Sequence, residues 1–148
     1  MGRISKAQLE AALGGAQVLV QLLDKDFDGI ADEVLVEQVI EKAELESASA
    51  VQVAFDLDDP VVKESRAIAQ QTLVLAVFWA YQKGTAGQGV PADVREDYQE
   101  ALRWFDRLAQ GTRALGEAKQ ARTSFPVEQV PIDPDSKRTT RRNMKGFC

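Results

Sequence analysis

The sequence predicts an all-α fold, a small helical bundle of three long helices and a short N-terminal helix with an extended C-terminal arm. Three observations support this fold class. Apolar residues recur every three or four positions in three long stretches, which is the period of an α-helix. No stretch shows the alternation of a convincing β-strand. The chain has 148 residues, 45% of them hydrophobic, which suits one domain with a single core.

The N-terminal elements are short. Residues 4–13 form the predicted N-terminal helix, with Ser5 as its N-cap and Gly14 and Gly15 at its end. Residues 16–23 are apolar and add a helical turn or two. Gly14 and Gly15 separate these two pieces.

The first long helix is predicted to start at Asp32 and to run to about Phe55, where the sequence DLDDP stops it. The second long helix is predicted from Pro60 to Lys83, with Asp59 as its cap and Gly84 as its end. Its C-terminal half is apolar almost all round. We therefore interpret it as the central helix of the bundle, or as one buried by neighbouring subunits.

The third long helix is predicted to open at Pro91 and to stop at Gly111. Its apolar residues form a regular stripe, made of Val94, Tyr98, Ala101, Leu102, Phe105, Leu108 and Ala109. Core packing is the ordinary explanation for such a stripe. Trp104 lies beside the stripe in this register, so we predict that it faces a neighbouring subunit.

Charge divides the chain into an acidic body and a basic tail. Residues 1–132 hold 13 basic and 21 acidic side chains, whereas residues 133–148 hold five basic and two acidic ones. Prolines also gather toward the end of the chain, and helical periodicity is lost after residue 122. We predict a helical bundle domain at 1–122 and an extended basic arm at 123–148. The acidic body argues against general nucleic-acid binding.

Catalysis finds little support in the sequence. Histidine is absent, and no nucleophile or phosphate-loop motif is present. The single cysteine, Cys148, allows no intramolecular disulfide and no thiolate metal cluster. The longest apolar run, within residues 73–80, is too short to span a membrane. We predict a protein that is not an enzyme, with no cofactor and no membrane partner.

The acidic loop DKDFDGIAD is the sharpest local signal. Asp24, Asp26 and Asp28 match the first three ligand positions of a calcium-binding EF-hand loop, and Asp32 falls at position 9. Position 12, which needs a bidentate glutamate, is Leu35. An exposed acidic turn that caps the next helix is therefore the favoured interpretation, and a calcium-binding helical protein is an alternative.

The tail sequence SKRTTRRNMKGF is basic and has apolar residues near its end. A small DNA-associated protein that binds through this tail is a second alternative, with weak and salt-dependent binding. A peptide that orders on a protein partner suits the apolar residues better. The predicted docking residues are Arg138, Arg141, Arg142, Met144, Lys145 and Phe147.

Several stretches together resemble a known family. They are VEQVIEKAELESA, IAQQTLVLAVFWAY, DYQEALRWFDRLAQGTRALG and TRRNMKGF. The chain is similar, over about residues 18–148, to the head–tail connector proteins of Mu-like phages and prophages. It is more distantly similar to the head-completion adaptors of other long-tailed phages.

The resemblance implies a structural adaptor that forms a ring, dodecameric in this interpretation, under the portal at the capsid vertex. The partners would be the portal protein and the next neck or tail protein, and DNA would pass through the channel without sequence-specific binding. The arm residues above would dock these partners, and the loops 24–32 and 84–89 would meet a neighbouring ring. The protein would be found in the virion neck, and in the host cytoplasm during assembly.

Overall fold

The structure is a computed structural model that describes residues 4–85 and 89–111. These residues form six helices and no strand, which confirms the predicted all-α fold. The helices are α1 (Lys6–Leu13), α2 (Ala16–Leu23), α3 (Glu33–Val51), α4 (Pro60–Lys63), α5 (Arg66–Gly84) and α6 (Ala92–Ala109).

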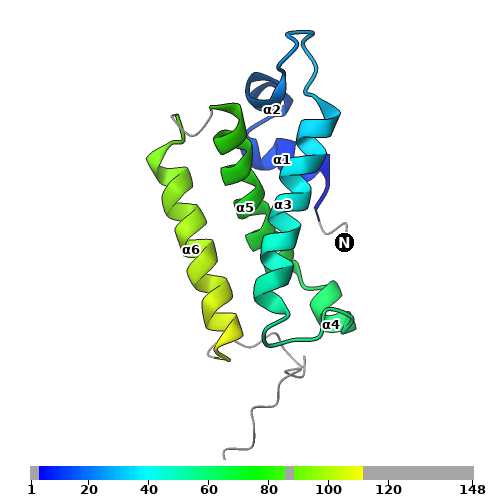
Figure 1. Cartoon of the computed structure of the whole chain (residues 1–148), viewed down its shortest axis with the longest axis vertical. Helices are drawn as coiled ribbons and strands as arrows, with labels where there is room; N and C mark the ends of the chain where they lie inside the picture. The colour runs from blue at the N-terminus through cyan, green and yellow to red at the C-terminus, as the bar shows by residue number, and fades with distance from the viewer. Residues whose placement is uncertain (1–3, 86–88, 112–148) are drawn as a thin grey trace, which may run out of the picture.

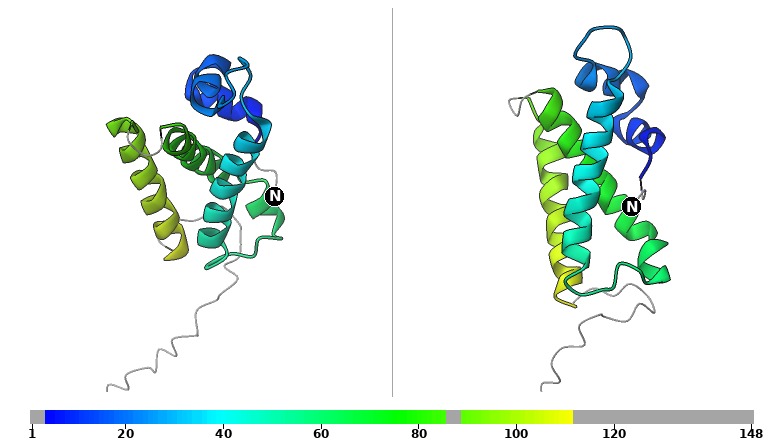
Figure 2. Two further views of the ribbon diagram at one scale, coloured as in Figure 1. Left: turned by 45° about the horizontal axis from the view of Figure 1, so that its top comes forward. Right: turned by 45° about the vertical axis from the view of Figure 1, so that its right-hand side comes forward.

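The three long helices run beside one another along the long axis of the molecule (Figure 1). Helix α5 packs against α1, α2, α3 and α6, so it is the central helix, as its all-round apolar sequence predicts. The loop between α2 and α3 lies at one end of the bundle, and α4 lies at the other (Figures 1 and 2).

The first helix ends at Gly14 and Gly15 as predicted, and α2 begins directly after them. Ser5 is the N-cap of α1, and Ser5 and Gln8 form a capping box in which each side chain accepts a hydrogen bond from the other residue's backbone N–H. Gly14 and Gly15 have φ angles of 97° and 140°. Residues that have a side chain rarely adopt such φ angles, so the two glycines allow α2 to fold back onto α1.

Helix α3 starts where predicted, with Asp32 as its N-cap, but it ends at Val51 rather than near Phe55. The carbonyl of Val51 accepts hydrogen bonds from the N–H groups of Ala54 and Phe55, which closes a turn. Only 2% of Phe55 is exposed. The chain therefore leaves the helix at Val51, and the buried Phe55 ring is part of the core after this turn.

The prediction of one helix from Pro60 to Lys83 is wrong, because the structure has two helices there. The Asp59 side chain caps α4 by accepting a hydrogen bond from the N–H of Val61 at 2.9 Å. A new helix then begins after Ser65, whose hydroxyl accepts from the N–H of Ile68 at 3.3 Å. Serine hydroxyls cap helices readily and compete with helix continuation, which explains the break.

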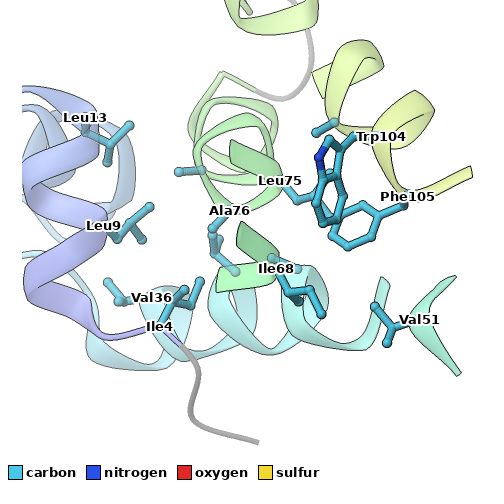
Figure 3. Close-up of a cluster of buried hydrophobic side chains, with 14 of the residues drawn as sticks. Ile4, Leu9, Leu13, Val36, Val51, Ile68, Leu75, Ala76, Trp104 and Phe105 are labelled. Atoms are coloured by element: carbon cyan, nitrogen blue, oxygen red, sulfur yellow. The ribbon is translucent and has the colours of Figure 1, made fainter. Parts of the chain in front are cut away.

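The core lies where α5 is covered on both sides (Figure 3). Figure 3 shows Trp104 and Phe105 of α6 side by side at α5, close to Leu75. Their rings meet edge to face, with centroids 5.1 Å apart. Trp104 is only 9% exposed, so the expectation that it lies beside the core stripe is wrong. Burial of the ring within a single chain supports core packing. The contact of Trp104 with a neighbouring subunit stays a prediction.

Candidate docking surfaces

The loop between α2 and α3 is held by its own aspartates. The Asp24 carboxylate accepts hydrogen bonds from the N–H groups of Asp28 at 3.3 Å and Gly29 at 2.9 Å. The Asp32 carboxylate accepts from the N–H of Lys25 at 3.2 Å. These bonds satisfy backbone donors that no regular helix pairs, so the loop has a defined shape at the end of the bundle.

Three predicted calcium ligands come together in this loop. Carboxylate oxygens of Asp24, Asp26 and Asp28 lie within 4.8 Å of one another. A hydrogen bond with the Asp32 carboxyl is the largest cause that raises the pKa of Asp26, and the negative charges of Asp32 and Asp28 raise it further. Leu35, at the position of the missing glutamate, packs against the core from α3. Calcium binding stays an untested alternative to the acidic turn.

Large apolar side chains surround this acidic loop and point into solvent. The exposed fractions are 90% for Phe27, 63% for Ile30 and 65% for Val34 at the start of α3. We refer to these three residues as the apolar tip. Phe27 also has a φ of 60°, which is an uncommon and strained conformation for a bulky residue. The fold gains no burial from this ring, so the apolar tip is a candidate contact surface.

A second candidate surface lies beside the central helix. Two hollows, of about 740 Å³ and about 250 Å³, share Val74 of α5 and Asp97 of α6 among their lining residues. We refer to the pair as the α5–α6 groove. The larger hollow is acidic, with Glu96, Asp97 and Glu100 along α6. The smaller hollow is apolar and is lined by Leu73, Val74 and Val77 of α5, with Ala12 of α1 and Val94 of α6.

A third hollow, of about 320 Å³, lies between α3 and α5 and has the opposite charge. Lys42, Trp79 and Lys83 line it. The Lys42 ammonium lies 3.7 Å from the centre of the Trp79 ring, which is a cation–π contact. The two sides of α5 therefore offer surfaces of opposite charge.

The predicted docking residues of the arm, from Arg138 to Phe147, lie outside the described residues, as does the boundary between the predicted domains. The DNA-associated alternative depends on the same segment and stays a prediction, which a gel shift at low salt would test. Across the described ranges, no helix is both long enough and apolar enough to cross a membrane.

Sequence reasoning named the loop 24–32 as a contact with a neighbouring ring but not its apolar side chains, and it missed the α5–α6 groove. The sequence did contain an indication of the apolar tip, because two large apolar residues, Phe27 and Ile30, lie within a polar, aspartate-rich loop. The α5–α6 groove had none, because its acidic and apolar sides come from helices whose relative rotation depends on tertiary packing.

With this geometry established, the family can be assigned. The family model described as "Bacteriophage Mu, Gp36" matches residues 4–131. The chain belongs to this family. The match spans all six helices, so the Gp36 family assignment applies to the bundle itself, and the chain is a phage protein. No curated protein and no solved structure matches the chain.

Proposed function

We propose that this member of the Gp36 family is a structural protein of the virion neck, a head-to-tail adaptor. In this proposal the protein forms a ring, of twelve subunits by the resemblance described above, beneath the portal. The ring extends the DNA channel and docks the next neck or tail component. Membership of a phage Mu family supports a role in phage structure or morphogenesis.

The observation that carries the proposal is the apolar tip. Phe27 and Ile30 in the loop between α2 and α3, and Val34 in the first turn of α3, expose large apolar surfaces. This loop lies at one end of the bundle (Figure 1). Aromatic and aliphatic side chains in such a position are typical anchors of protein–protein contacts, because water leaves them when a partner binds. An end-on contact is what a stacked ring requires, since adjoining rings meet along the channel axis.

The charge of the bundle supports passage of DNA rather than binding to it. The described residues include 9 basic and 19 acidic side chains. A net negative wall repels phosphates, so DNA would slide through a ring of such subunits without adhering.

Co-sedimentation with the portal assembly from the same genome, followed by negative-stain imaging, tests the proposal. We expect the full chain to add a ring to the portal or to the next neck protein. The double variant Phe27→Ser/Ile30→Ser should lose one of these two contacts, because it removes the apolar anchors. The matched control is Leu45→Ser, since Leu45 is 61% exposed but lies on α3 away from the loop.

Two further outcomes assign the contacts or reject them. A chain truncated after Ile132 that no longer adds a ring would place a docking contact in the arm. Full binding by the Phe27→Ser/Ile30→Ser variant would remove the apolar tip from the proposal. If the full chain bound neither the portal nor a neck protein, the adaptor function would be wrong.

A further inference from the structure

We propose that residues 137–148 of the free chain bind in the α5–α6 groove of the same molecule. The proposal goes beyond the adaptor function and does not depend on it. It rests on the charge of the groove, on its apolar hollow, and on the order in which the chain would meet the two.

The larger hollow has the charge that a basic segment requires. Glu96, Asp97 and Glu100 are exposed along one side of α6. Among the described residues that line the larger hollow, Arg103 is the one cation. Arg103 lies 3.6 Å from Glu100. Among the described residues, Glu96 and Asp97 take part in no ion pair. The segment 137–148 contains five basic and no acidic side chains, so it complements this surface.

The smaller hollow accepts the apolar residues of the same segment. Leu73, Val74 and Val77 are only partly buried, although they pack against the core. The segment contains Met144 and Phe147. An aromatic side chain that covers three half-buried aliphatic residues removes apolar surface from water on both partners, which favours binding.

The order of the residues fits the direction of the groove. After α6 ends at Ala109, the end of the groove nearest in the chain is the acidic one, at Arg103. The apolar hollow, at Val94, lies about 14 Å further along α6. In the segment, Arg141 and Arg142 likewise come before Met144 and Phe147. A chain that folds back along α6 therefore brings each kind of residue to its complementary hollow.

The length of the chain allows this contact within one molecule. Arg141 lies thirty positions after Gly111, and an extended chain of that length reaches about 100 Å. The whole path back along α6 to Val94 is about 26 Å. A tethered segment also has an effective concentration of about millimolar at the groove, and a free partner would have to compete with it at that concentration. Binding to the same molecule is therefore favoured over binding to a second copy.

The hollow between α3 and α5 can be compared with the α5–α6 groove as a binding surface for the same segment. It also contains apolar surface, but Lys42 and Lys83 line it, and these residues repel a basic segment. The proposal therefore predicts that the segment distinguishes between the two sides of α5.

Crosslinking from the single native cysteine tests the inference. In the full chain, Gln70→Cys places a thiol at the exposed rim of the apolar hollow, within reach of Cys148 if Phe147 is bound there. The control is Gln38→Cys, an exposed glutamine that lines the basic hollow. With a short bismaleimide, we expect an intramolecular crosslink that forms about tenfold faster in the Gln70→Cys protein. Peptide mapping by mass spectrometry would identify it.

Reversing the charges of the groove and of the segment distinguishes a crosslink that depends on binding from one that forms by random collision. In the Gln70→Cys background, Glu96→Lys/Asp97→Lys should slow the crosslink about fivefold. Adding Arg141→Glu/Arg142→Glu should restore it. Glu96 and Asp97 are exposed, so the substitutions should not disturb the core. A restored rate would also show that the variants fold, because the crosslink requires an intact groove.

Three results would overturn the proposal. Equal crosslinking rates in the Gln70→Cys and Gln38→Cys proteins would show that the segment has no preference for the groove. A product with the mass of two chains, without the intramolecular one, would assign the groove to a second copy. A rate that charge reversal leaves unchanged would remove the electrostatic basis of the contact.

Discussion

The hydroxyl of Tyr98 on α6 donates a hydrogen bond to Oε1 of Glu46 on α3, with an oxygen–oxygen distance of 2.7 Å. The other carboxylate oxygen, Oε2, accepts a hydrogen bond from Nε1 of Trp79 on α5 at 2.8 Å. One carboxylate thus joins the three long helices. The Tyr98 ring also stacks on Phe78, with centroids 3.9 Å apart, so the polar contact and the aromatic packing fix the same rotation of α6.

The variant Tyr98→Phe should be less stable than the wild type by about 1 kcal/mol in urea denaturation. A hydrogen bond to a charged group contributes more than a neutral one, but partial exposure of this site reduces its value. Tyr81→Phe is the matched control. Tyr81 is also a half-buried tyrosine of the bundle, and no side-chain hydrogen bond of its hydroxyl is seen among the described residues. An equal loss of stability in both variants would contradict the assigned role of the bond.

Alkaline pH should destabilise the protein through the same tyrosine. Burial raises the pKa of Tyr98 above its ordinary value of 10.0, and the hydrogen bond to Glu46 raises it further. The folded state therefore holds the phenolic proton more tightly than the unfolded state. This contribution to stability is fully present below pH 10.0 and is lost as the pH rises through the folded-state pKa.

Urea denaturation of the wild type and of Tyr98→Phe between pH 9 and pH 11 measures this effect. The wild type should lose stability above pH 10 more steeply than Tyr98→Phe, which lacks the titrating group. The Tyr81→Phe control should keep the steep dependence. Parallel curves for wild type and Tyr98→Phe would show that Tyr98 titrates alike in the folded and unfolded chains.

The contact between α2 and α5 depends on the absence of a side chain at Gly84. A Cβ atom at this position would lie 2.6 Å from the carbonyl oxygen of Leu22 and 2.9 Å from its Cα. Since both atoms belong to the backbone, α2 would have to move. We expect Gly84→Ala to reduce the free energy of unfolding by about 1–3 kcal/mol, measured by urea denaturation.

Gly89→Ala is the control for this substitution. A Cβ atom there would meet the Thr85 side chain at 3.2 Å rather than a backbone. A side chain yields more easily, so the loss should stay within about 0.5 kcal/mol. If the two alanine variants were equally stable, the close approach of Leu22 would not limit the residue at position 84.

The parts of this fold that sequence predicts are those with local causes. Ser5 and Asp59 mark helix starts because the side chain of each accepts a hydrogen bond from a backbone N–H in the first turn of its helix. Asp32 is the N-cap of α3 by position, but its carboxylate accepts from the N–H of Lys25 instead. The central position of α5 also follows from its own composition. The break before Ser65 was missed because the polar residues from Lys63 to Arg66 are also compatible with the exposed surface of an unbroken helix, and a serine among them does not by itself mark a new helix start.

The parts that sequence does not predict depend on how the helices are rotated against one another. Trp104 was placed beside the stripe by counting residues, but α6 turns it onto α5 together with Phe105. The α5–α6 groove has the same origin, since Val74 and Asp97 are 23 positions apart in the chain. The segment 137–148 has a distinctive basic sequence, whereas the groove that we propose for it is formed only when α5 and α6 pack together.

Phe27 should be replaceable without loss of stability. Its φ of 60° costs free energy in a bulky residue, whereas asparagine adopts this conformation more readily. Because the ring is 90% exposed, Phe27→Asn should keep or raise the free energy of unfolding, by up to about 1 kcal/mol. Ile30→Asn should leave it within about 0.5 kcal/mol of the wild type. A clear loss of stability in Phe27→Asn would mean that the ring supports the fold rather than a partner contact.

The acidic loop should tolerate the loss of one carboxylate. A hydrogen bond with the Asp32 carboxyl is the largest cause that raises the pKa of Asp26, and the negative charges of Asp32 and Asp28 raise it further. For an acid whose pKa is raised in the folded state, ionisation at neutral pH opposes folding, so removing the charge relieves this effect. Asp26→Asn should therefore melt at the same temperature as the wild type or higher at pH 7. Below pH 3, where the carboxyls are protonated in both states, the difference should disappear.

Calcium should bind this loop weakly, with no saturable heat below about 1 mM in isothermal calorimetry. Asp24, Asp26 and Asp28 bring three carboxylates together, but both oxygens of Asp24 already accept backbone hydrogen bonds. Leu35 supplies no oxygen at the position where a calcium loop of this kind has its bidentate ligand. A saturable heat at micromolar calcium that Asp26→Asn abolishes would contradict this expectation, because the loop would then complete the ion's coordination without that ligand.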